Sequence, residues 1–223
     1  MYQARDVVRS EAELRAVLGE IAPSQVDKVI DRLDDHCRAW IERSPFMVIA
    51  SADGGGRFDV SPRGDAPGFV RVLDAQTLAV PDRPGNHRGD TLTNVLQNPR
   101  VGLLFAVPRR REMLRVGGSA QIVRDPDLLA TLAVGDRLPK LALVVRVDEA
   151  MFHGGKAMIR SGLWQPERWP SVLGLPSYAQ ALTDHAAPPH SCEEMEERIA
   201  RDDCERLQPV ADVIQRHAIA PGL

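Results

Sequence analysis

Residues 77–95 read TLAVPDRPGNHRGDTLTNV, and this stretch carries the strongest indication of a binding site in the sequence. A strand is expected at 77–80, followed by a loop with two prolines and two glycines and then by a helix. Arg83, His87 and Arg88 flank the exposed N–H groups of that helix start, and this arrangement favours a bound phosphate. The same composition is also typical of a solvated surface turn.

Short β-like runs lie on both sides of this loop. Residues 46–50 are continuously apolar, and residues 57–61 alternate so that Phe58 and Val60 are expected to face the core. Residues 113–123 place Leu114, Val116, Ala120 and Ile122 on one face of a strand. Further strands are expected at 68–73, 100–106 and 141–148. Because the connections are short, antiparallel pairing is favoured, and the sequence predicts a mainly β, α+β barrel with peripheral helices.

Helical patterns occur mainly outside these runs. Apolar spacings of three and four predict a helix over 26–41, with Ser24 as its N-cap and a shorter helix at 11–19 before it. Two short helices are expected to begin after Asp90 and after Asp125, with each of these residues serving as an N-cap.

The sequence divides into two regions. We expect residues 1–175 to form the N-terminal helices and the barrel. Residues 176–223 are expected to form a linker and a charged C-terminal helix packed on or near that barrel.

Composition limits the classes of function. The chain has 223 residues and a net charge of −3, so no global basic field attracts nucleic acid or an anionic membrane. No apolar stretch is long enough for a membrane helix, and the start lacks a secretory pattern. Three cysteines without paired spacing are typical of a reducing cytoplasm. His185, His190 and Cys192 lack a fourth ligand, so no metal site is predicted.

Two further segments contain candidate binding residues. Ser61 and Arg63 end an expected strand on the face opposite to Phe58 and Val60, although a solvated arginine at a strand end has the same pattern. Residues 156–164 place basic side chains four positions apart, followed by a tryptophan that could stack on a ring system. A charged helix face with one packed tryptophan is the alternative interpretation.

The segments FMVIAS, FDVSPRGD, TLAVPDRPGNHRGDTLTNVLQNPRVGLLF and LRVGGSAQIV occur in this order over about residues 10–170. In this order they resemble the flavin-binding core of pyridoxamine 5'-phosphate oxidase-related proteins, and particularly an uncharacterised bacterial subgroup. The resemblance implies a six-stranded antiparallel split β-barrel that binds flavin mononucleotide (FMN). It also implies a homodimer with two flavin sites in its interface.

The resemblance also implies roles for individual residues. Those expected to bind the phosphate and ribityl groups of FMN are Ser61, Arg63, Asp82, Arg83, Asn86 and Arg88. Those expected to border the isoalloxazine ring are Val48, Ile49, Ala50 and Ser51. Those expected to reach the flavin of the opposite subunit are Lys156, Arg160 and Trp164. No catalytic acid or base is identified.

The function expected from the resemblance is an FMN-dependent oxidoreductase that transfers hydride or electrons between the flavin and a small substrate, with NADH or NADPH as electron donor. The Arg-x-His signature of the oxidase proper is absent, which argues against pyridoxamine phosphate as that substrate. The alternative is a non-catalytic flavin- or haem-binding module that stores its ligand or senses redox state. A deazaflavin in place of FMN is a further alternative.

Overall fold

A computed structural model describes residues 1–207, and one antiparallel sheet forms its centre. The sheet order is β2-β1-β5-β6-β7-β4-β3, with every neighbouring pair antiparallel. The strands are β1 Phe46–Ala52, β2 Phe58–Gly64, β3 Arg71–Val72, β4 Thr77–Pro81, β5 Arg100–Ala106, β6 Met113–Val123 and β7 Ala142–His153. The predicted antiparallel split-barrel class is therefore confirmed, with seven strands in place of six because the two-residue β3 extends one edge.

The long strands β6 and β7 join the two halves of the sheet. β6 pairs with β5 over 113–119 and with β7 over its whole length, and β4 pairs with β7 over 142–146. An irregularity between Gly117 and Gly118 lets β6 change direction. A Cβ on Gly118 would lie 2.1 Å from the carbonyl oxygen of Arg146, so the bend requires glycine there. Large apolar side chains fill the interior, among them Met47, Ile49, Leu103, Phe105, Leu114 and Val145.

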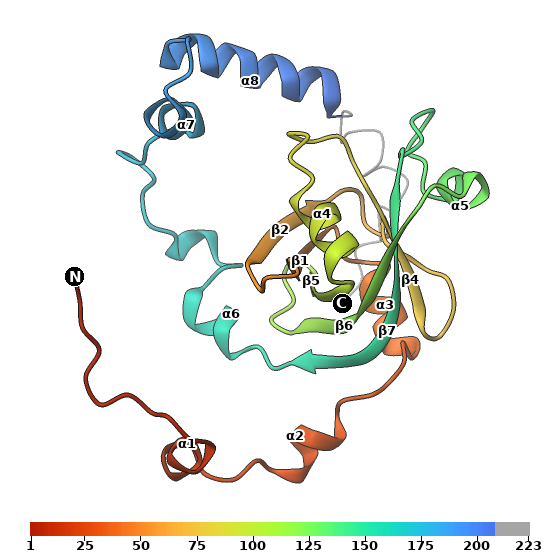
Figure 1. Cartoon of the computed structure of the whole chain (residues 1–223), viewed down its shortest axis with the longest axis vertical. Coiled ribbons are helices and arrows are strands. Elements are labelled where there is room, and N and C mark those ends of the chain that lie inside the picture. The colour runs from red at the N-terminus through yellow and green to blue at the C-terminus, as the bar shows by residue number, and fades with distance from the viewer. Residues whose placement is uncertain (208–223) are drawn as a thin grey trace.

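Helices cover the sheet and extend from it (Figure 1). They are α1 Glu11–Leu18, α2 Pro23–Asp27, α3 Asp35–Ile41, α4 Asp90–Gln97, α5 Pro126–Thr131, α6 Lys156–Ser161, α7 Tyr178–Ala186 and α8 Cys192–Arg206. α3 buries Cys37 and Ile41 in the core, whereas α4 packs on β1, β2 and β6. α1 and α2 lie away from the barrel, and no helix in residues 1–207 is long and apolar enough to cross a membrane.

The prediction of one helix over 26–41 is wrong. α2 ends at Asp27, and Ile30 instead pairs with Ala150 through two backbone hydrogen bonds of 3.0 and 2.7 Å. A new helix then begins at Asp35, because the Asp34 side chain accepts a hydrogen bond from the Cys37 amide at 2.9 Å. The apolar spacing marked the residues that face the core, but a strand bridge and a second N-cap divide the segment.

The predicted N-caps of two helices are also wrong by one or two residues. α2 begins at Pro23 with Ala22 as its N-cap, so Ser24 lies inside the helix. α4 begins at Asp90 itself, with Gly89 as its N-cap. Asp125 caps α5 as predicted, since its side chain accepts from the amides of Asp127 and Leu128.

The two faces of β2 are the reverse of those predicted. Phe58 and Val60 are 76% and 65% exposed, whereas Asp59, Ser61 and Arg63 are half-buried on the opposite face. The alternation is therefore correct and its direction is wrong. The polar face of β2 is turned towards α4 and the loop before it, which leaves the apolar face outside.

Candidate functional site

A cavity of about 600 Å³ opens between the end of β2, the loop from β4 to α4, and the segment before β7. Its wall is formed by 61–64 from β2, by 81–92 from the loop and the start of α4, by 138–140, and by Phe69. This volume lies within the range of small-molecule sites. The loop singled out in the sequence thus forms one wall of the cavity.

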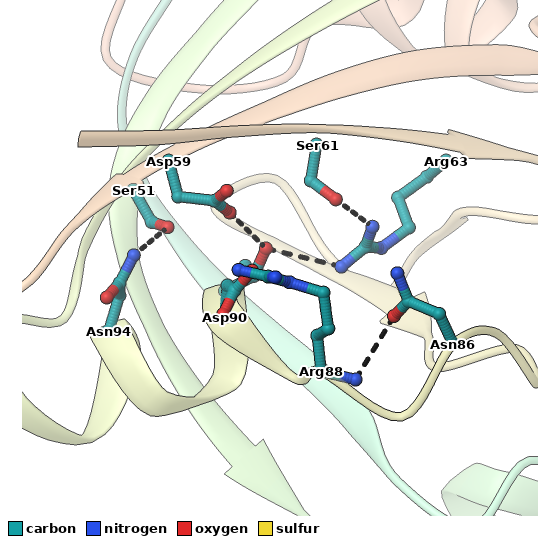
Figure 2. A network of polar contacts seen from close by, with 9 residues as sticks. Ser51, Asp59, Ser61, Arg63, Asn86, Arg88, Asp90 and Asn94 are labelled. Carbon is teal, nitrogen blue, oxygen red and sulfur yellow. Dashed lines mark hydrogen bonds and ion pairs between the residues drawn. The ribbon is translucent and has the colours of Figure 1, made fainter. Parts of the chain in front are cut away.

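The polar face of β2 holds a network that ends at α4 (Figure 2). The Arg63 guanidinium donates to the Ser61 hydroxyl, to the Pro62 carbonyl at 2.9 Å and to Thr91 Oγ1 at 3.3 Å. Thr91 in turn donates to Asp59 Oδ2 at 3.2 Å. These contacts hold Arg63 half-buried at the cavity wall and fix the first turn of α4 against β2.

The loop before α4 is held by its own polar contacts. Arg83 Nε lies 2.6 Å from Asp65 Oδ2, and both side chains are largely buried. Asn86 Oδ1 accepts from the Arg88 amide at 3.1 Å, and Arg88 Nε lies 2.7 Å from Asp90 Oδ2. Gly89, the N-cap residue, has a φ of +66°, a conformation that glycine adopts without strain.

The three arginines on the cavity wall differ in whether a carboxylate pairs with them. Arg83 and Arg88 have carboxylate partners, but Arg63 has no salt bridge among residues 1–207. Burial raises the pKa of the nearby Asp82 carboxyl, and the charge of Arg63 partly opposes this shift. α4 has no side-chain cap at its N-terminus, so its positive end also faces this region.

The structure brings one of the three predicted residue groups together. The members that line the cavity are Ser61, Arg63, Asp82, Arg83, Asn86 and Arg88. The second group, Val48 to Ser51 on β1, does not line it. Ile49 is fully buried, and the Ser51 hydroxyl is buried and accepts from Asn94 Nδ2 at 3.0 Å (Figure 2).

The third group also lies outside the cavity wall within one chain. Lys156 and Arg160 are exposed on α6, and Trp164 Nε1 donates to the Arg110 carbonyl at 2.8 Å. The predicted contacts of the second and third groups with a flavin therefore stay predictions.

Some residues of the site were not identified in the sequence. Thr91 and Asp65 fix two arginines, and both lie within segments that contain predicted site residues, the stretch 77–95 and SPRGD. Leu138, Pro139 and Lys140 line the cavity from a segment without any motif, so only the fold reveals them. Within residues 1–207, no group of three or more His, Cys, Asp or Glu is placed to bind a metal ion.

Comparisons with known proteins define the family to which this fold belongs. Residues 33–154 match the sequence profile of the family described as pyridoxamine 5'-phosphate oxidase. A search of curated proteins gave no match.

Solved structures with a similar fold include three bacterial proteins. HupZ from Group A Streptococcus is 18% identical, with a TM-score of 0.43, and covers 52% of this chain and 90% of its own. An FMN-binding protein from Syntrophomonas wolfei is 9% identical, with a TM-score of 0.41, and covers 52% and 82%. HutZ, the haem storage protein from Vibrio cholerae, is 20% identical, with a TM-score of 0.40, and covers 55% and 94%.

The fold and the profile match define a split-barrel protein of a flavin-binding class. The matched segment covers more than half of the chain and contains every strand of the sheet. The chain belongs to the pyridoxamine 5'-phosphate oxidase family.

Proposed function

We propose that the protein binds FMN in this cavity and acts as an FMN-dependent oxidoreductase on a small substrate. The observation that carries the proposal is Arg63, a half-buried guanidinium on the cavity wall without a salt-bridge partner in residues 1–207. Even partial burial of a cation has a cost that a bound anion offsets. A phosphate group would supply that anion.

The residues present fit FMN in both charge and size. Arg83 and Arg88 stand beside Arg63 on the cavity wall, and the uncapped start of α4 adds a partial positive charge. Asn86 offers an amide to a polyol chain. About 600 Å³ leaves room for a ring system beyond the phosphate.

Each residue then has a definite task in the proposed function. Arg63, Arg83 and Arg88 hold the phosphate, while Thr91 and Asp65 keep two of these guanidinium groups in place. When bound, FMN supplies the hydride and electron chemistry that amino-acid side chains lack. NADH or NADPH is the proposed electron donor.

We further propose that the working unit is a homodimer. The outer face of β2 exposes Phe58 and Val60, and Val60 stands opposite Ala50 of β1, so the apolar surface continues across two strands. Exposed apolar surfaces of this kind mark interaction sites in soluble proteins. The third group of predicted residues also needs a second copy of the chain, because none of its members lines the cavity of its own chain.

Titration of the flavin-free protein with FMN and with riboflavin tests the proposal. Two charged hydrogen bonds to the phosphate would make FMN bind at least about 100-fold more tightly than riboflavin. Equal affinities for the two flavins would contradict the phosphate assignment. Anaerobic addition of NADH or NADPH then distinguishes an oxidoreductase, whose flavin is bleached, from a storage module, whose flavin stays oxidised.

A further inference from the structure

The C-terminal end of α8 lies between the two loops that frame the cavity. Arg206 donates through Nη1 to the carbonyl oxygen of Gly85 at 2.6 Å, although 121 positions separate them. Arg137 Nη1 in turn donates to the carbonyl oxygens of Glu205 at 3.4 Å and Arg206 at 3.2 Å. Figure 1 shows α8 running from α7 to the loop that precedes α4.

The helix end is well suited to bridge these loops. Asp202 lies one turn earlier, with Oδ1 2.7 Å from Arg206 Nε, and so orients the guanidinium whose Nη1 reaches Gly85. The last carbonyl groups of a helix lack partners within it and carry partial negative charge, which Arg137 satisfies.

Each loop held by α8 contributes to the cavity wall. Gly85 lies between Arg83 and Asn86 in the loop that is proposed to hold the phosphate. Arg137 precedes Leu138, Pro139 and Lys140, which also line the cavity. A helix end bound to both loops restricts their separation.

We propose that the end of α8, through Arg206 and Arg137, is a clasp that positions the phosphate-binding loop for its ligand. Arg206 is a positioning residue, because it acts through the backbone of Gly85. The inference rests on the proposed function in taking FMN as that ligand, whereas the contacts of the clasp exist without it.

The first test compares Arg206→Ala with Arg201→Ala in the full-length, flavin-free protein. Arg201 is exposed on the same helix and has no side-chain hydrogen bond within residues 1–207, which makes it a matched control. Amide hydrogen exchange over residues 83–89 is expected to be about tenfold faster in Arg206→Ala and unchanged in Arg201→Ala. Equal exchange in all three proteins would overturn the clasp.

FMN affinity provides the second measurement, with about tenfold weaker binding expected for Arg206→Ala only. Unchanged affinity beside faster loop exchange would refute the positioning role. If none of the proteins binds FMN, the proposed function fails, while the exchange experiment still decides whether the clasp exists.

A double-variant cycle shows whether the two arginines act through one helix end. If releasing either contact undocks α8, then Arg137→Ala and Arg137→Ala/Arg206→Ala should speed loop exchange by about the same factor as Arg206→Ala alone. Factors that multiply in the double variant would mean that the two loops are held independently, and the clasp would be refuted.

Discussion

Removal of the Arg63 guanidinium is the most informative single change to the site. In Arg63→Ala, the cavity loses a half-buried cation that has no salt bridge to residues 1–207. A hydrogen bond to a charged group contributes about 1.5–3 kcal/mol, so FMN should bind roughly 10- to 150-fold more weakly. Riboflavin, which has no phosphate, should be affected much less.

The fold should tolerate this change. The 3.2 Å hydrogen bond from Thr91 to Asp59 does not involve the arginine, so we expect the Thr91 hydroxyl to keep a partner in the variant. The expected cost in the free energy of unfolding is about 1 kcal/mol, measured by urea denaturation. Arg57→Ala is the control, because Arg57 is exposed just before β2 and outside the cavity wall. Fluorescence titration that gives Arg63→Ala an FMN affinity within about twofold of the wild type would refute the phosphate assignment.

Three further predictions concern pH, the sheet and the dimer. Burial raises the pKa of Asp82 above its ordinary 3.8, so the wild-type protein loses stability as pH rises through the raised pKa and the carboxyl ionises. Asp82→Asn cannot ionise, so its free energy of unfolding should increase relative to that of the wild type over the same pH range. A difference between the two proteins that does not change with pH would contradict this. Gly118→Ala should lower the free energy of unfolding in urea by about 3 kcal/mol or more, whereas Gly102→Ala, whose Cβ meets nothing within 4 Å, should cost far less. Val60→Asp should convert a dimer to a monomer in sedimentation experiments while Val17→Asp on α1 does not, and a monomeric wild type would refute the proposed pairing.

Most strands could be predicted from the sequence because their signals are local. The alternation in 113–123 and the apolar run from Phe46 require no knowledge of distant residues, and both segments are strands. The faces of β2 could not be predicted in the same way. Apolar residues were assumed to face the core, yet Phe58 and Val60 are exposed in the single chain.

The break within 26–41 has a similar origin. Its cause is the pairing of Ile30 with Ala150, a contact between residues far apart in the sequence, which outweighs the helical spacing.

The candidate site was predictable where it coincides with a compact motif. The RPGN segment and the arginine of SPRGD were predicted from the sequence to bind a phosphate, and the structure places both on the wall of one cavity. Lys140 and the end of α8 approach that cavity only through the fold, because nothing in their local sequence indicates a ligand.

The absorption spectrum of the purified full-length protein, with the released chromophore identified by mass, shows whether the protein binds FMN. Binding of FMN by every chain predicts flavin absorption bands and a released species with the mass of FMN, at one per chain. A protein that is colourless and cannot be reconstituted with FMN, or one with a haem Soret band, would contradict it.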